Sequence, residues 1–224
     1  MASARAIVGE DCLRHRSFIS AHGSGTPLNR TTESHGLNEV AKAFGIKNWP
    51  ISAIKCYLGH PLTPAAGDQI VTALGTWKYG LIPGIFTLDH IAKDVQTSHL
   101  RFSKDHIDVG PDGTDVALIN SKGFGGNNAT GVILSPQITL KMIAQKHGDS
   151  AVNSYQTLNE PVVEKAQQYD QDTIRGLTAS TYKDSERVLN DSNLDMTDKS
   201  LKVPGFDKPV KLELTSPYPD MSLD

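Results

Sequence analysis

The chain has 224 residues, of which 38% are hydrophobic and 21% charged, and its net charge is −3. Such totals are typical of an ordinary globular protein with a sizeable core. Because no long basic run occurs, we expect no nucleic-acid partner. No apolar stretch approaches the roughly 20 residues that span a bilayer, and the N-terminus lacks the pattern of a signal peptide. We therefore expect a cytoplasmic protein with no membrane partner.

The two cysteines, Cys12 and Cys56, have no CxxC spacing. At most one disulfide is possible, so free thiols in a reducing compartment are the default expectation. Neither cysteine follows a tight small-residue turn that opens a helix, which is where a reactive thiolate is often stabilised. We predict that neither acts as a nucleophile.

The first half of the chain alternates predicted strands and helices. Residues 1–16 are weakly patterned, and residues 18–21 indicate a short buried strand. A helix with one apolar face is expected from residue 31 until Gly45 ends it. Residues 49–55 then indicate a second strand. Residues 65–79 predict a helix that is apolar nearly all round, as in the middle of a domain.

A polar connection follows, with a short strand predicted at residues 107–109. Two further strands, at 116–120 and 129–134, flank a glycine-rich hairpin tip at residues 121–128. The order β-α-β-α-β-β is typical of an α/β layered half-domain in which helices cover a sheet. After Pro136 the composition becomes polar, with amphipathic helices predicted at 138–146 and 161–175. We therefore predict a domain at residues 1–136 and a partly helical extension at 137–224.

Two histidines stand where the predicted strands end. His22 follows the first strand, and Lys55 and His60 follow the second. Imidazoles beside a shared pocket can bind a carbonyl oxygen and stabilise developing negative charge. Glu33, on the first turn of the intervening helix, is a natural partner for Lys55. The alternative is a pair of half-buried structural histidines beside a surface Lys–Glu contact, and spacing alone favours that alternative.

Other site chemistry has weaker support. No histidines or cysteines have the HExxH or zinc-finger spacing, so we predict no metal site. The glycine-rich tip lies between two strands rather than before a helix, so it is not expected to bind phosphate. It is either a plain hairpin loop or a loop that packs on a reacting centre, with Phe124 covering that centre.

Three motifs in order resemble one known family. They are AHGSGTP at residues 21–27 with Glu33 after it, SAIKCYLGH at 52–60 with AAG at 65–67, and NSKGFGGNN at 120–128. Together they resemble the C-terminal half of a β-ketoacyl-acyl-carrier-protein synthase, a condensing enzyme of the thiolase superfamily. The long tail and the GHPLTP variant at residues 59–64 resemble the extended proteobacterial synthases.

The resemblance implies a thiolase-like layered α-β-α fold and a decarboxylative Claisen condensation in fatty acid synthesis. His22 and His60 would be the catalytic histidines that bind the malonyl thioester. Lys55 would support decarboxylation, Glu33 would pair with Lys55, and Phe124 would match a gating phenylalanine. An acyl carrier protein, acyl or malonyl thioesters and a homodimer partner are implied, without a cofactor.

The chain departs from the family pattern at three points. Arg30 stands where an aspartate is usual, and Lys122 stands where an apolar residue is usual. No turn equivalent to the family's cysteine turn is present, so we expect the N-terminal half of a synthase to supply the nucleophile and this chain alone to be inactive in condensation. Two alternatives stay open. They are a non-catalytic partner subunit of a complete synthase and a fragment of a polyketide-type ketosynthase.

Overall fold

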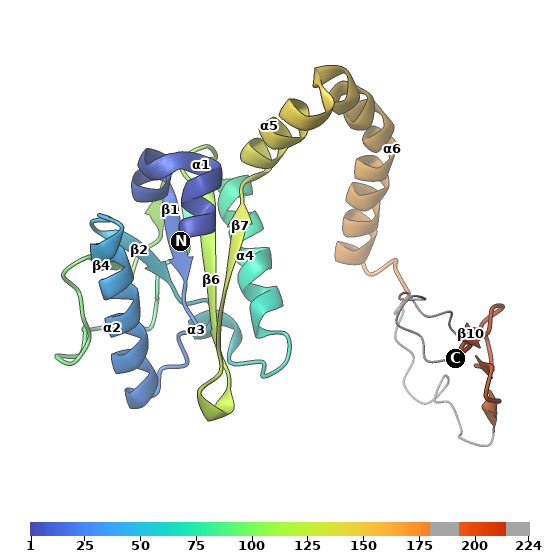
Figure 1. The fold of residues 1–224 in the computed structure, drawn as a ribbon, viewed down its shortest axis with the longest axis horizontal. Coiled ribbons are helices and arrows are strands. Elements are labelled where there is room, and N and C mark those ends of the chain that lie inside the picture. The colour runs from blue at the N-terminus through green and yellow to red at the C-terminus, as the bar shows by residue number, and fades with distance from the viewer. Residues whose placement is uncertain (180–192, 214–224) are drawn as a thin grey trace, which may run out of the picture. The chain divides into compact units, whose positions relative to one another are not determined.

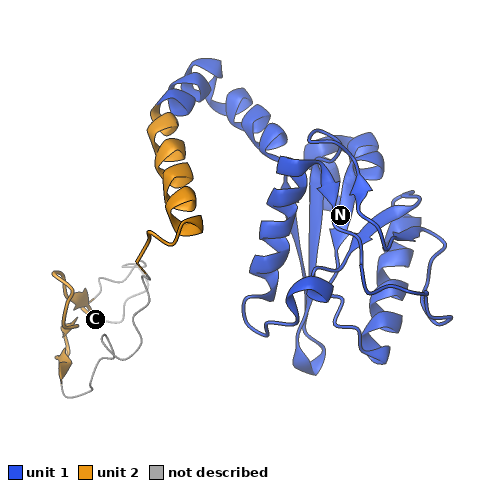
Figure 2. Cartoon of the chain, turned by 180° about the vertical axis from the view of Figure 1, so that it is seen from behind, with its two compact units in different colours: residues 1–157 blue, residues 158–224 orange. Residues whose placement is uncertain are grey.

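The computed structural model describes residues 1–179 and 193–213. The chain divides into two compact units, residues 1–157 and 158–224 (Figure 2). The predicted boundary between residues 136 and 137 stays a prediction, and part of the predicted extension lies outside the described residues. None of the helices in the described ranges combines the length and apolar character that a membrane crossing requires.

The first unit is built on a five-stranded sheet in the order β4-β2-β1-β6-β7 (Figure 1). Strands β4, β2, β1 and β6 are parallel, and β7 runs antiparallel to β6. The strands are β1 (Ser17–Ser20), β2 (Trp49–Ser52), β4 (Leu100–Phe102), β6 (Val116–Lys122) and β7 (Asn128–Leu134). A separate antiparallel pair joins β3 (Leu81–Ile82) to β5 (Ile107–Asp108).

Helices cover both faces of this sheet. One apolar cluster joins Ile19, Ile51 and Leu118 to residues of α1 (Ala2–His15) and α2 (Pro27–Ala43). The other joins Phe18 to Ala73 and Trp77 of α4 (Ala65–Tyr79). Neighbouring residues of β1 thus enter different clusters, as the alternation of side chains along a strand requires. The predicted layered α/β fold is confirmed.

Several elements differ from the predicted bounds. Residues 2–15 form α1, whose weak pattern is explained by a kink at Gly9, where φ is 82°. Helix α2 begins at Pro27, four residues before the predicted start, because the Thr26 side chain accepts a hydrogen bond from the Asn29 amide and caps the helix. The second strand ends at Ser52, and Lys55 begins a short helix instead, α3 (Lys55–Leu58).

The rest of the described chain is helical and then extended. Helix α5 (Pro136–His147) is followed by α6 (Asp149–Ile174), which starts well before the predicted residue 161 and contains Pro161 in its interior. A 3₁₀ turn, Phe124–Gly126, lies at the tip of the β6–β7 hairpin. In the second unit, β8 (Asp195–Met196), β9 (Ser200–Lys202) and β10 (Val210–Lys211) form a small antiparallel sheet.

Candidate active site

His22 lies in a turn just beyond the end of β1. The next residue of this turn, Gly23, occupies a position that only glycine fits. Gly23 has a φ of 53°, and a Cβ added there would lie 2.9 Å from the Cβ of Ala53. The turn therefore packs directly against the chain that leaves β2, which is where Lys55 and His60 follow. Close approach of these two strand ends brings the predicted site residues together.

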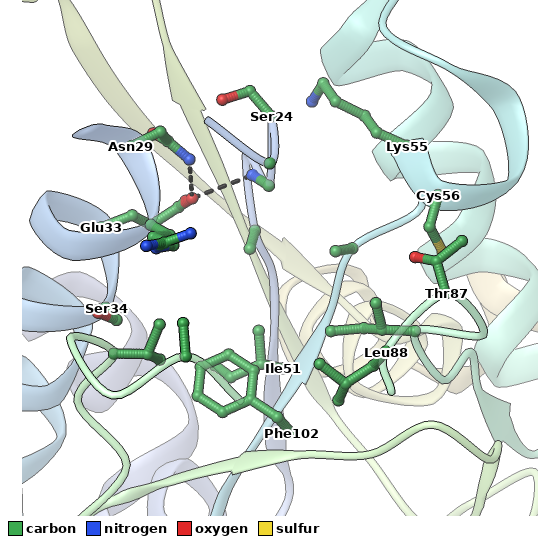
Figure 3. A pocket seen from close by; sticks show the side chains of 18 of the residues that line it. Ser24, Asn29, Glu33, Ser34, Ile51, Lys55, Cys56, Thr87, Leu88 and Phe102 are labelled. Atoms are coloured by element: carbon green, nitrogen blue, oxygen red, sulfur yellow. Dashed lines mark hydrogen bonds between the residues drawn. The ribbon is translucent and has the colours of Figure 1, made fainter. Parts of the chain in front are cut away.

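Glu33 fixes this turn from α2. Its carboxylate accepts hydrogen bonds from the backbone N–H groups of His22 at 2.8 Å and Gly23 at 3.0 Å. The side-chain amide of Asn29 also donates to it (Figure 3), as does that of Asn120. The carboxylate is buried, so these four donors replace the water that it loses on folding. Glu33 thus holds the backbone beside His22 in place.

Gln69 is a residue that sequence reasoning missed. It is fully buried on α4, and its Nε2 donates to the carbonyl oxygens of Ser20 and Ala21, both at 2.8 Å, and of Asn120 at 3.1 Å. It thereby fixes the ends of β1 and β6 against each other. Its position four residues after Ala65, on the buried face of α4, is the signal that could have identified it.

His22 and His60 lie edge to face, with ring centroids 5.1 Å apart and an angle of 82° between the ring planes. The His22 ring is buried, whereas His60 is exposed. The backbone N–H of Lys122 donates to Nδ1 of His22 at 3.3 Å. Because Nδ1 accepts this bond, the proton of neutral His22 is on Nε2.

Lys55 is buried, and its Nζ has no hydrogen-bond partner within the described chain. The expected Glu33–Lys55 ion pair is therefore wrong, because backbone and amide donors occupy the Glu33 carboxylate. Burial lowers the pKa of Lys55, while the charges of Glu33 and Asp68 oppose that change. The charge of Glu33 therefore acts on Lys55 at a distance, without a hydrogen bond or ion pair between the two side chains.

Burial also lowers the pKa of His22, and the positive charge of Lys55 lowers it further. His60 and Lys122 act in the same direction, against the opposing charge of Glu33. The lowered pKa keeps the His22 ring neutral around neutral pH. This agrees with the hydrogen bonding, because a ring whose Nδ1 accepts a hydrogen bond carries a proton on Nε2 alone.

A cavity of about 610 Å³ lies beside these residues, and Lys55, His60 and Glu33 are in its wall. Figure 3 shows Glu33 and Lys55 on opposite sides of it, with Ile51, Leu88 and Phe102 at its apolar end. Arg30 also lines the cavity, where its guanidinium forms a two-pronged ion pair with Asp94. The positive charge of Arg30 is thus neutralised by Asp94, which lies in the connection between β3 and β4.

Phe124 is 89% exposed at the hairpin tip, so it covers nothing within the described residues. Its gating role stays a prediction. Lys122, next to this tip, donates from Nζ to the hydroxyl of Thr32 on α2. Lys122, which departs from the family pattern, therefore links the hairpin to α2 and places a positive charge near His22.

The cysteines lie in settings that disfavour the thiolate. The Cys12 thiol donates to the Asp115 carboxylate at 3.3 Å, and burial together with that carboxylate raises its pKa to about 11. Cys56, in the cavity wall, also has a raised pKa because of burial. Both are free thiols. Within the described residues, no group of three or more His, Cys, Asp or Glu side chains could hold a metal ion.

Residues 14–89 match the family model described as "Beta-ketoacyl synthase, C-terminal domain". This chain contains the C-terminal domain of a β-ketoacyl synthase. It is 44% identical to β-ketoacyl-acyl-carrier-protein synthase FabY of Pseudomonas aeruginosa over 99% of its length, and covers 35% of that protein. The similarity thus includes the segment after Pro136. With 3-oxoacyl-acyl-carrier-protein synthase 1 of Escherichia coli, identity is 30% over half of this chain and 26% of the relative.

Comparison with solved structures supports the same family assignment. The crystal structure of the noncanonical ketosynthase FabY from P. aeruginosa aligns with a TM-score of 0.78 and 43% identity, over 99% of this chain and 34% of that one. A ketosynthase from module 1 of the bacillaene synthase of Bacillus amyloliquefaciens aligns with a TM-score of 0.50 at 19% identity over 59% of this chain and 24% of that one, which supports the thiolase-like fold alone. The chain spans about a third or less of the length of the relatives named here.

Proposed function

We propose that this chain forms the malonyl-decarboxylating part of a β-ketoacyl-acyl-carrier-protein synthase site in fatty acid synthesis. The supporting observation is the edge-to-face pair of His22 and His60, in which the Nδ1 of His22 accepts a backbone hydrogen bond. This pairing leaves Nε2–H of His22 free to donate to a substrate oxygen, and a second imidazole lies within reach of the same oxygen.

In the proposed reaction, His22 and His60 donate hydrogen bonds to the carbonyl oxygen of a malonyl thioester. The bond between the carboxylate carbon and the α-carbon breaks, carbon dioxide leaves, and the electron pair forms an enolate. Negative charge then develops on the thioester oxygen, where preorganised donors stabilise it more strongly than in the ground state. One such donor typically contributes about 3 kcal/mol.

Lys55 supports this step electrostatically and makes no hydrogen bond to either histidine. Its buried positive charge favours the enolate and disfavours protonation of His22. Glu33 and Gln69 act as positioning residues, because they fix the backbone that bears His22. The carboxylate of Glu33 makes four hydrogen bonds and is not available as a general base.

In condensation, the enolate attacks an acyl group held as a thioester on a cysteine, and the cysteine thiolate leaves. Neither Cys12 nor Cys56 is suited to this role, because both thiols have raised pKa values. The nucleophile is therefore supplied by another stretch of polypeptide, such as an N-terminal synthase half, and this chain alone decarboxylates without condensing. Carrier-protein thioesters in the cytoplasm are the proposed substrates, and no cofactor takes part.

Two alternatives are less well supported. A non-catalytic partner subunit need not keep the contact between the His22 and His60 rings, or Lys55 and His60 in the wall of one cavity. A polyketide-type ketosynthase is disfavoured, because the relative that covers 99% of this chain is a β-ketoacyl-acyl-carrier-protein synthase. Two polyketide synthases among the matches are 30% and 28% identical over 52% and 69% of the chain.

The test is release of carbon dioxide from malonyl-carrier protein by the purified chain, alone and with a candidate N-terminal half. His60→Ala removes an exposed ring, so it should fold normally and lose about a hundredfold in decarboxylation rate. His35→Ala, at an exposed position on α2, is the matched control and should keep the full rate. Unchanged decarboxylation in His60→Ala would show that the assigned role is wrong.

A further inference from the structure

Helix α3 is too short to hold its own position. It has four residues, Lys55–Leu58, and its N-cap residue provides no side-chain hydrogen bond. Helices shorter than about 12 residues are marginally stable in water unless they pack against other elements. Because Lys55 lies on α3 and His60 follows two residues after its end, the contacts of α3 determine where both side chains lie.

Tyr57 attaches α3 to the connection between β3 and β4. Its hydroxyl donates to the carbonyl oxygen of Gly84 at 2.9 Å, and its ring packs against Phe86 with the ring centroids 4.8 Å apart. Burial raises the pKa of the adjacent Cys56, and the backbone N–H groups of Phe86 and Thr87 oppose that increase, which places them against its sulfur (Figure 3). Two consecutive residues of α3 thus bind the same short segment.

This segment is itself fixed by the chain that follows β4. The backbone N–H of Gly84 donates to Nδ1 of His106 at 3.1 Å, and that of Ile85 donates to the carbonyl oxygen of Ser103 at 2.8 Å. A Cβ added at Gly84 would overlap two backbone carbonyl oxygens that follow Ser103, so the two stretches of chain lie in close contact. The hydroxyl of Tyr57 therefore binds an acceptor that is held in place.

We propose that Tyr57 is a positioning residue, which acts through α3 on Lys55 and His60. The inference rests on the proposed decarboxylation, in which both side chains take part. Tyr57 lies outside the cavity wall, whereas Lys55 and His60 are in it, so Tyr57 acts on a substrate only through them. Since α2 and α4 hold the His22 turn, the two rings are aligned by separate supports, and the bond from Tyr57 to Gly84 fixes the His60 side.

Tyr57→Phe tests this role, because it removes the hydroxyl and keeps the ring. The kcat for release of carbon dioxide from malonyl-carrier protein should fall about fivefold, the usual effect of losing one hydrogen bond. The KM should stay constant, because Tyr57 does not contact the substrate. Tyr79→Phe, at an exposed tyrosine of α4, is the matched control and should keep the full rate. An unchanged kcat in Tyr57→Phe would overturn the proposal.

NMR measures the positioning without catalysis. The rings of His22 and His60, with centroids 5.1 Å apart, should give a nuclear Overhauser effect between their protons. This signal should weaken severalfold in Tyr57→Phe and stay constant in Tyr79→Phe. A constant signal in Tyr57→Phe, even with lowered stability, would show a purely structural role and overturn the proposal. If the unaltered chain releases no carbon dioxide but the ring contact still depends on Tyr57, the proposed function fails and the positioning role stands.

A second variant tests the route through Gly84. His106→Ala removes the acceptor of the Gly84 N–H, and the chain should still fold because His106 is exposed. If Tyr57 acts through this segment, the two changes weaken the same support. The double variant should then lose no more kcat than about the larger of the two single losses. Losses that multiply, as for independent sites, would show that Tyr57 does not act through Gly84.

Discussion

At the scale of residues, the site combines a carboxylate and an ammonium that do not touch. Glu33 gives its hydrogen-bonding capacity to the backbone of His22 and Gly23, whereas Nζ of Lys55 has no hydrogen-bond partner in the described chain. A buried lysine without a partner is costly, because its charge loses hydration without a compensating contact. Lys55 thus places an ammonium group without a hydrogen-bond partner near the histidines, where its positive charge favours an anionic intermediate.

Replacing Lys55 with methionine should raise the pKa of His22, because a nearby positive charge is removed while the alkyl stem stays. The increase should be partial, since burial is the larger cause of the lowered pKa. The folded protein disfavours protonated His22, so its contribution to stability is complete above about pH 6.5 and is lost as the pH falls. That acid-induced loss should be smaller in Lys55→Met.

Titration of the His22 ring by NMR measures this effect directly. Lys47→Met is the matched control, because Lys47 is exposed and is not among the charges that shift His22. A pKa of His22 that stays constant or falls in Lys55→Met would contradict the electrostatic role.

At the scale of elements, the site depends on how closely the turn after β1 approaches the chain after β2. Glu33 from α2 and Gln69 from α4 hold the end of β1 from its two sides. Helices on both faces of the sheet thus supply the supporting hydrogen bonds, and the histidines themselves occupy connections. Catalytic groups on short connections between rigid elements are a common arrangement.

Gly23→Ala should destabilise the fold and slow decarboxylation. The positive φ alone costs an alanine about 1–2 kcal/mol, and the new Cβ would also lie 2.9 Å from Ala53. Gly25→Ala is the matched control, because Gly25 has a φ of 74° with nothing within 4 Å of the added Cβ. Denaturant unfolding should therefore show a larger loss for Gly23→Ala, and Ala53→Gly should recover part of the difference. Equal losses at Gly23 and Gly25 would mean that the close approach has no energetic role.

Apolar periodicity was sufficient to predict β1, β6, β7 and α4, whose bounds match residues 65–79, but it missed the short strands β3 and β4. Periodicity could not predict α1, because Gly9 interrupts the helical pattern, or the place of Lys55 on α3. The meeting of His22 and His60 was expected from strand ends on one edge of a sheet. The hydrogen bonds of Glu33 and Gln69 could not be predicted, because backbone groups supply most of their partners.

At the scale of the molecule, the outer side of α4 bears exposed apolar side chains. Val71 is 68% exposed and Leu74 49%, which agrees with the expectation that this apolar helix exposes part of its surface when the chain is alone. Contiguous apolar surface of this kind marks a contact with another polypeptide. The proposed reaction also requires a cysteine from another segment, so a contact on α4 and an incomplete site are consistent with each other.

We expect the purified chain to aggregate or to associate through this side of α4. In the purified chain, the double variant Val71→Gln and Leu74→Gln should lower light scattering and the fluorescence of a hydrophobic dye. Unfolding stability should barely change, because both side chains are exposed. Leu28→Gln, at an exposed leucine of α2, is the matched control and should change neither signal. A monodisperse monomer that binds no dye before these changes would contradict this expectation, since uncovered Val71 and Leu74 would then have no consequence for association.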